Sequence, residues 1–195
     1  MATTIPTPVE ASETPSTRYW TYTDMLQEMS ESNQPSELWD GKLLMSPAPI
    51  PRHQMVVGRI YVMLTNFVTT RRSGVVIVSP VDVILTETRV VQPDVIYISE
   101  ARKDVIQDRI RGVPDLAVEV ISEGSWRRDR VYKKALYEQH GLPEYWIVDL
   151  ETRTIEVFSL VAGAYQLFAR ATGAQSAPSK ILDGFSISFD QLESR

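Results

Sequence analysis

The chain contains no cysteine and only two histidines. Disulfide bonds, thiolate zinc sites and cysteine nucleophiles are therefore excluded. No apolar run approaches the roughly 20 residues that a membrane-spanning helix needs, so no membrane partner and a cytoplasmic location are expected. The chain also lacks the G-x-S-x-G motif of serine hydrolases, the phosphate-binding P-loop and the G-x-G-x-x-G loop of dinucleotide-binding domains.

The rest of the composition is that of an ordinary globular protein. Of the 195 residues, 43% are hydrophobic and 23% are charged, and this length suits one domain with a sizeable core. Residues 1–17 are rich in Thr, Pro, Ser and Glu and lack the apolar region of a signal peptide. They predict a disordered tail, and residues 18–195 are expected to form a single domain.

The net charge of −5 argues mildly against a nucleic-acid partner, because such binding modules usually carry an excess of basic residues. The charge is unevenly distributed, however. Residues 124–134 contain five basic side chains and one acid, a local charge of about +4. Such a patch can meet phosphates even on an acidic protein, since salt screens charges beyond about 8–10 Å. A solvated helix face explains the same pattern, and composition leaves both interpretations open.

Periodicity and turn residues predict helices packed on a mixed sheet, an α/β fold of the α+β type. Helices are expected over residues 22–31, 53–71 and 126–140; Gly74 would stop the second and Gly141 the third. Val131, Ala135 and Leu136 would form the core stripe of the third helix. Asp40-Gly41 predicts a hairpin within residues 37–45. Further strands are expected at 75–78, 81–85, 94–98, 116–121, 145–148, 154–160, 164–170 and 186–189.

Two of these strands carry an acid where a buried strand should have none. Asp94 opens one strand and Glu119 interrupts the next, 25 residues later. A buried charge is costly unless it is paired or binds a metal. If the strands are adjacent, the two carboxylates converge and repel unless a cation lies between them, and hard oxygen ligands suit Mg²⁺ or Mn²⁺. Alternatively, Asp94 caps a turn and Glu119 points to solvent from an edge strand.

Lys133 follows Glu119 by 14 residues, on the expected helix, and lies four residues from both Asp129 and Tyr137. These three side chains therefore share one face of the helix. An exposed salt bridge with Asp129 is one explanation. The other is a lysine that reaches over the strand ends toward a metal-bound water and a phosphate. Beside two carboxylates its charged form is favoured, so orienting water suits it better than acting as a base.

Four stretches together carry a resemblance to a known family: ELWDGKLLMSPAPIPRHQMVVGRI, QPDVIYIS, GVPDLAVEVIS and RRDRVYKKALYEQHGLPEYWIVDLETR. They resemble the Uma-type restriction endonuclease family, within the PD-(D/E)XK nuclease superfamily, over about residues 22–190. The resemblance implies a restriction-endonuclease-like core, with a mixed β-sheet flanked by helices. It also implies a Mg²⁺- or Mn²⁺-dependent endonuclease that hydrolyses nucleic acid, with DNA as the expected substrate.

By the same resemblance, Asp94 is the motif aspartate and Glu119 the second acid. The plain pattern would place the lysine at Ile121, which cannot serve, so the matching lysine is Lys133 on the next helix. Glu37 and His53 match a recurrent upstream glutamate and a recurrent histidine. Each has a structural alternative, as a hairpin residue and as a helix-start cap.

The implied reaction is metal-assisted phosphodiester hydrolysis that leaves a 5′-phosphate and a 3′-hydroxyl. The metal ligands would be Asp94, Glu119, the Val120 carbonyl and Glu37, while Lys133 positions the attacking water. The residues expected to hold the nucleic-acid backbone are Arg127, Arg128, Arg130 and Lys134.

Two alternatives stay open at this stage. A two-carboxylate glycosidase is compatible with the residue types, but gives Lys133 and the arginines no task. A nuclease fold kept as a silent nucleic-acid-binding or self-associating module is the main rival, and the presence of Asp94, Glu119 and Lys133 together favours the enzyme. A homodimer is expected by analogy, because cutting two strands needs two sites.

Overall fold

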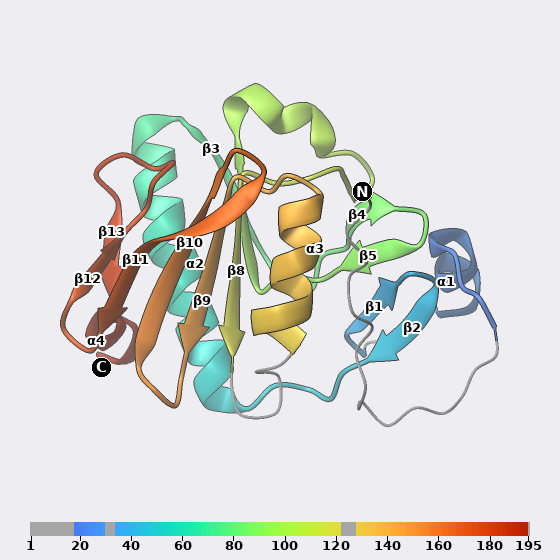
Figure 1. The fold of residues 1–195 in the computed structure, drawn as a ribbon, viewed down its shortest axis with the longest axis horizontal. Coiled ribbons are helices and arrows are strands. Elements are labelled where there is room, and N and C mark those ends of the chain that lie inside the picture. Colours follow the sequence, from blue (N-terminus) through green and yellow to red (C-terminus); the bar gives the residue numbers. More distant parts are fainter. Residues whose placement is uncertain (1–17, 30–33, 122–127, 195) are drawn as a thin grey trace.

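Two sheets stand side by side in the structure (Figure 1), a computed structural model that describes residues 18–29, 34–121 and 128–194. The predicted tail, residues 1–17, lies outside the described residues. No helix in the described part of the chain is both long and apolar enough to cross a membrane. The α+β fold with mixed strands and flanking helices is as predicted.

The smaller sheet has the strand order β2-β1-β5-β4-β7. Its strands are β1 (Ser36–Trp39), β2 (Lys42–Met45), β4 (Val83–Thr86), β5 (Arg89–Val91) and β7 (Ile110–Arg111), and α1 (Tyr22–Met29) packs against it. The predicted hairpin joins β1 to β2. Asp40 and Gly41 both have positive φ, 49° and 77°, as a two-residue type I′ turn requires. Position 41 favours glycine because its φ of 77° strains other residues, and an added Cβ, 2.4 Å from the Tyr19 ring, would also displace that exposed side chain.

The larger sheet has the order β11-β10-β9-β8-β6-β3. Its strands are β3 (Gly74–Val78), β6 (Val95–Ser99), β8 (Leu116–Ile121), β9 (Glu144–Asp149), β10 (Thr154–Val161) and β11 (Ala164–Thr172). Strands β8 and β9 run parallel, and every other neighbouring pair runs antiparallel. The central strands β8 and β9 are buried along their whole length. Their Val- and Ile-rich sequences match that environment, because both faces of this sheet are covered.

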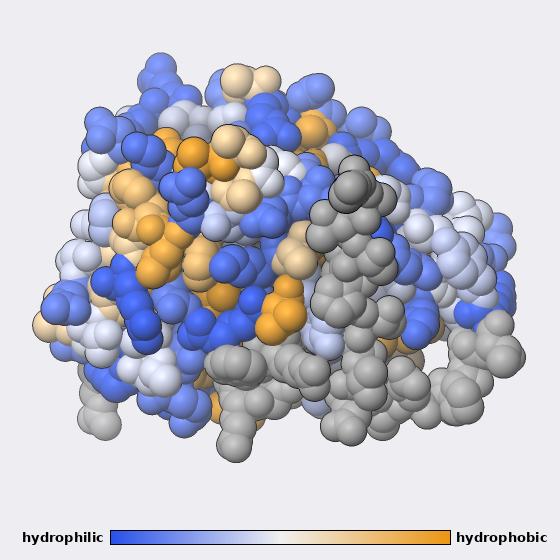
Figure 2. Space-filling view, in the orientation of Figure 1, coloured by the Kyte–Doolittle hydropathy of each residue, from blue (hydrophilic) through white to orange (hydrophobic). Residues whose placement is uncertain are grey.

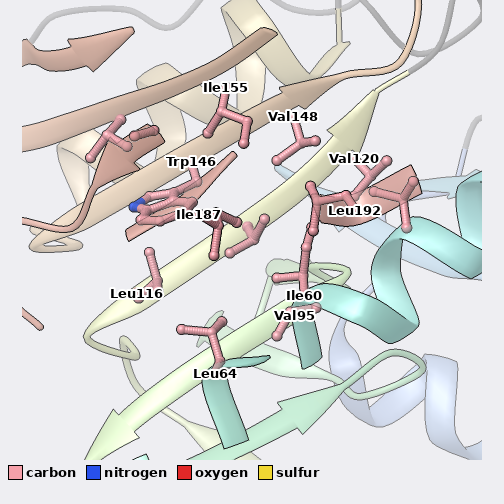
Figure 3. Packing of buried hydrophobic residues seen from close by; sticks show 14 of the residues in the cluster. Ile60, Leu64, Val95, Leu116, Val120, Trp146, Val148, Ile155, Ile187 and Leu192 are labelled. Atoms are coloured by element: carbon pink, nitrogen blue, oxygen red, sulfur yellow. The ribbon is translucent and has the colours of Figure 1, made fainter. Parts of the chain in front are cut away.

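Helix α2 (Pro51–Arg71) covers one face of the larger sheet, and α3 (Lys134–Gln139) lies on the other (Figure 1). Apolar residues at helical spacing bury one side of α2: Val56, Val57, Ile60, Leu64 and Val68. Figure 3 shows Ile60 and Leu64 directed toward the apolar side chains of the strands, among them Trp146.

Helix α2 ends at Arg71, as predicted, but the residue that stops it is not the predicted glycine. Arg72 takes the left-handed conformation, with φ of 52°, and its N–H bonds back to the carbonyls of Thr69 and Val68. Gly74 does not stop the helix but opens β3. A left-handed residue ends a helix whether or not it is glycine.

The third predicted helix differs in its first half. Residues Arg128–Lys133 form a π-helical segment, η2, and only Lys134–Gln139 are α-helical. The predicted core position Val131 is wrong, since that side chain is 41% exposed, whereas Tyr132, Leu136 and Tyr137 are buried. The wider π turn shifts the inward-facing positions by one residue relative to an α-helix. Gly141, with φ of 77°, ends the helix as predicted.

The remaining elements close the ends of the larger sheet. The charged connection after β6 contains the 3₁₀ helix η1 (Glu100–Val105). The chain ends with a small hairpin of β12 (Ser176–Pro178) and β13 (Ser186–Ser188), followed by α4 (Phe189–Glu193). On the face that carries α3, Figure 2 shows apolar side chains gathered over β10 and β11, where Val161, Leu167 and Phe168 are exposed.

Candidate functional site

Asp94 and Glu119 lie on neighbouring strands of the larger sheet. Strands β6 and β8 pair antiparallel with Val95 opposite Val118, so the two acids occupy the next positions along the pair. The Asp94 side chain crosses to the partner strand, where its Oδ2 accepts the Val120 N–H at 2.7 Å. The two carboxylates are therefore brought to the same end of the strand pair.

Glu119 is enclosed. Strand β8 lies between β6 and β9, and Glu119 is 3% exposed, so the alternative of a solvent-facing acid on an edge strand is wrong. Its Oε1 accepts hydrogen bonds from Lys133 Nζ and from the Tyr137 hydroxyl, each at 2.9 Å. Both donors come from the helix that follows β8, and they fix the orientation of the carboxylate.

The ammonium of Lys133 lies among three carboxylates. Its Nζ is 2.9 Å from Glu119 Oε1, 3.0 Å from Glu37 Oε1 and 3.6 Å from Asp129 Oδ1. All four side chains are buried. Burying an acid is costly without a counter-ion, so this lysine provides the local charge that keeps the acids together. With Asp94 close by, the cluster contains four carboxylates and one ammonium.

Glu37 reaches the cluster from the other sheet. It belongs to β1, where its Oε2 accepts the Trp39 indole N–H at 3.2 Å. Its Oε1 accepts the backbone N–H of Gln92 at 2.9 Å. The site therefore lies where the two sheets meet, and residues 92–94 connect them.

His53 adjoins Asp94 at the start of α2. Its Nε2 lies 3.3 Å from Asp94 Oδ2. Burial lowers the pKa of His53, but the Asp94 carboxylate and the backbone of Val120 outweigh that effect and raise it. Its ring therefore contacts a candidate metal ligand directly, which a helix-start cap would not require.

Burial raises the pKa of Glu119 well above its ordinary value, and the carboxylates of Asp129, Asp94 and Glu37 add to the rise, while Lys133 opposes it. Every added negative charge in a buried place favours the protonated acid. A cation bound among these oxygens would relieve the same repulsion.

The donor set of the cluster suits Mg²⁺ or Mn²⁺ chemically, because carboxylate and carbonyl oxygens are the ligands these ions prefer. Within the described residues, the hydrogen bonds of the Asp94 side chain use Oδ2 and those of Glu119 use Oε1, which leaves one oxygen on each for a cation. The positions of these ligands are less suited to a metal ion than their chemistry is. Among the residues that the structure describes, no three Asp, Glu or His side chains are arranged so that they could hold a metal ion. The Lys133 ammonium lies among the carboxylates of Glu37, Glu119 and Asp129.

The four residues predicted to contact nucleic acid differ from one another in how the structure describes them and in their neighbours. Arg127 lies outside the described residues, and of Arg128 only the backbone is described. Arg130 makes ion pairs with Asp149, at 3.1 Å, and with Glu156. Lys134 is half-buried, with its Nζ 3.8 Å from the centre of the Phe158 ring. A contact of these residues with phosphate stays a prediction.

Asp129 and Tyr137 are members of the cluster to which sequence analysis gave no role. Their spacing of four residues from Lys133 was the available signal, and it placed all three on one face of the helix. The structure adds the partners: Tyr137 donates to Glu119, and the Tyr145 hydroxyl donates to the Asp129 carbonyl at 3.0 Å. That second bond ties η2 to β9.

Comparisons with known proteins show the fold and the family of this chain. A crystal structure of a protein described as a putative nuclease belonging to DUF820, from Anabaena variabilis, has a similar fold, with a TM-score of 0.73 and 16% sequence identity. The similarity covers 88% of this chain and 96% of that one. A search of curated proteins finds no match. The family Uma2, described as "Putative restriction endonuclease", matches residues 21–190. The chain therefore belongs to the Uma2 family.

Proposed function

We propose that this protein is a metal-dependent endonuclease that hydrolyses phosphodiester bonds of nucleic acid, with DNA as the substrate. The observation that carries the proposal is the convergence of Asp94, Glu119 and Lys133 at one end of the strand pair β6–β8. Lys133 Nζ lies 2.9 Å from Glu119 Oε1 although 14 residues separate them. Membership of a nuclease family supports the same reaction.

In the proposed reaction, Asp94, Glu119, the Val120 carbonyl and Glu37 would hold Mg²⁺ or Mn²⁺. Such an ion would supply an electrophile for the phosphate and would make a water more acidic. Lys133 orients the attacking water and offsets the negative charge that develops on the phosphate oxygens. Tyr137 fixes Glu119, and His53 fixes Asp94.

The water gives up one proton to solvent as its oxygen bonds to phosphorus and the bond to the 3′ oxygen breaks. The leaving oxygen takes up one proton from solvent, so the products are a 5′-phosphate and a 3′-hydroxyl. Cutting both strands of a duplex needs two such sites, and we propose a homodimer for that task, whereas nicking needs one.

A second candidate is a nuclease fold that binds nucleic acid or itself without cleaving. One observation favours it: the carboxylates already have a counter-ion, because the Lys133 ammonium contacts Glu119 and Glu37 within 3.0 Å. In that case the cluster would serve folding alone, and added metal would have no place to bind.

The test compares wild type with Asp94→Asn, which keeps the shape of the side chain and removes its charge. Titration calorimetry with Mn²⁺ and a plasmid-nicking assay are run on the same preparations. We expect Mn²⁺ binding and nicking by the wild type, with both lost in the variant. If the wild type binds metal but does not nick DNA, the expected substrate becomes RNA in place of DNA.

Asp115→Asn is the matched control. Asp115 precedes β8 at the opposite end of the same strand pair, and its Oδ2 accepts the Ser99 N–H at 2.7 Å, the same length as the bond from Val120 to Asp94. Its side chain is 14% exposed, against 17% for Asp94. The control should bind Mn²⁺ and nick like the wild type. If the wild type binds no metal, with DNA present or absent, the metal-dependent endonuclease is excluded. The second candidate, a nuclease fold that binds without cleaving, would then be the better description.

A further inference from the structure

A hollow of about 400 Å³ lies beside the cluster, on the side of the smaller sheet. Asp82, Gln92 and Arg109 line it, together with Gln107 and Asp108. A second hollow of about 150 Å³ shares Asp82, Gln92 and Arg109 and extends toward α1 and Ser36. The larger volume is within the range of small-molecule sites, and both donors and acceptors line it.

The polar side chains of the hollow hold one another in place. Gln92 Nε2 donates to Asp82 Oδ1 at 2.8 Å, and the Tyr22 hydroxyl donates to Asp82 Oδ2 at 2.9 Å. Arg109 Nε donates to the Tyr22 oxygen at 3.1 Å. This network presents a carboxylate, an amide and a guanidinium in fixed positions, as a recognition site requires.

One buried atom of this network lacks a hydrogen bond. Gln92 Oε1 is buried and has no hydrogen-bond partner among the described residues. The amide orientation is settled by its neighbour, because the opposite one would place an oxygen against the Asp82 carboxylate. A buried acceptor without a partner destabilises the protein, and a ligand in the hollow cannot reach an atom with almost no exposed surface. Recognition therefore falls to Asp82 and Arg109, whose side chains are 16% and 45% exposed.

The hollow is directly connected to the candidate site. Gln92 precedes Asp94 by two residues, a span of at most about 7 Å of chain. Its backbone N–H donates to Glu37 Oε1 at 2.9 Å, and that oxygen contacts Lys133. A group held in the hollow therefore lies near the phosphate that the proposed reaction would cut.

We propose that the hollow receives a guanine base of the nucleic acid, next to the cleaved phosphate; this inference rests on the proposed function. Guanine carries two neighbouring donors, N1–H and the N2 amino group, which suit the two oxygens of the Asp82 carboxylate. Its O6 and N7 are acceptors that suit the Arg109 guanidinium. Adenine offers one amino donor and no O6, so it satisfies fewer of these groups.

The test measures binding without catalysis. Fluorescence anisotropy in EDTA compares labelled single-stranded oligothymidylates that carry one central dG or one central dA, with full-length protein. We expect the dG strand to bind about tenfold more tightly, the size of one good base contact. Arg109→Ala and Asp82→Asn should each abolish that preference.

Arg111→Ala is the control, because Arg111 lies on the same short strand but pairs with Asp108. It should keep the preference, and thermal unfolding of each variant checks that it is folded. Equal binding of the two strands by the wild type, or a preference unchanged in Arg109→Ala, would overturn the inference. If the protein prefers guanine but binds no metal, the guanine site is supported and only the catalytic proposal is overturned.

Discussion

Lys133 has two roles that compete at the scale of the single residue. In the proposed reaction it orients water, yet in the structure its ammonium already neutralises Glu119 and Glu37. A cation that enters the cluster must share those carboxylates with it. The lysine is therefore expected to lower the affinity of the site for metal while it supports the chemistry.

Lys133→Met should separate these roles. Removing the ammonium leaves the acids without their nearby positive charge, so we expect Mn²⁺ to bind at least about tenfold more tightly, since attraction in a buried place is weakly screened. Nicking should be lost, and the metal-free variant should be less stable than the wild type by about 3–5 kcal/mol. Calorimetry, the nicking assay and urea unfolding with and without Mn²⁺ measure the three effects.

Lys103→Met provides the control, because Lys103 is exposed and pairs with Glu100. It should leave metal affinity, nicking and stability unchanged. Unchanged or weaker Mn²⁺ binding by Lys133→Met would show that the ammonium and the metal do not compete.

The candidate residues differ in how far sequence could identify them. Asp94 and Glu119 stand out physically, since each places a charge on an apolar strand, and the structure shows both at the end of one strand pair. Lys133 is a candidate from its spacing to Glu119, Asp129 and Tyr137, and the family resemblance gives it the role of the motif lysine. Glu37 could not be derived locally, because its contact with Lys133 joins strand β1 to the helical segment η2 across 96 residues of chain. No feature of the sequence predicted the hollow around Gln92.

At the scale of the element, strand β9 is fixed to the C-terminal hairpin by one buried acid. Glu144 is completely buried, and its two oxygens accept hydrogen bonds from the side chains of Trp146 and Ser179 and from the backbone N–H groups of Lys180 and Ile181. No interpretation of the sequence included it. Glu144 directly follows Leu142 and Pro143, where a polar residue at the start of a strand is expected to be exposed.

Glu144→Ala should destabilise the fold by about 3 kcal/mol or more, because it leaves several buried donors without an acceptor. Glu144→Gln should cost less, since its carbonyl oxygen keeps part of the acceptor capacity. Urea unfolding measures both values. Mn²⁺ binding under native conditions should survive, because Glu144 pairs with Leu116, whereas Glu119 pairs with Ile147 farther along the two strands. Loss of metal binding with an intact fold would place Glu144 in the site.

Element positions followed from periodicity, but details of the helices did not. The long apolar stripe of α2 and the Asp40-Gly41 turn each follow from local rules. The π-helical segment η2 does not, because a single extra residue in a turn leaves no mark in the pattern of apolar residues. The misplacement of Val131 follows directly from that turn.

At the scale of the whole molecule, an acidic protein must bind a polyanion through a small part of its surface. Arg130 is engaged by Asp149 and Glu156, so the phosphate contacts expected among the predicted residues are Arg127, Arg128 and Lys134. A contact with three phosphates gives a slope of about −3 in log affinity against log salt.

Lys134→Gln should reduce the size of that slope by about 0.9 on duplex DNA, and Arg130→Gln should leave it unchanged. Anisotropy titrations at several salt concentrations measure the slopes. A smaller slope in Arg130→Gln would mean that its ion pairs open when nucleic acid binds.

The three acids around Lys133 also constrain how this chain can change over generations. A descendant that no longer needed cleavage could not simply replace the lysine, because Glu37, Glu119 and Asp129 would stay buried without their ammonium. It would have to lose several acids together, or keep the lysine long after the reaction had been abandoned. The pair Glu119 and Lys133 is therefore required for folding whether or not a relative cleaves, and inactive relatives are expected to carry it too.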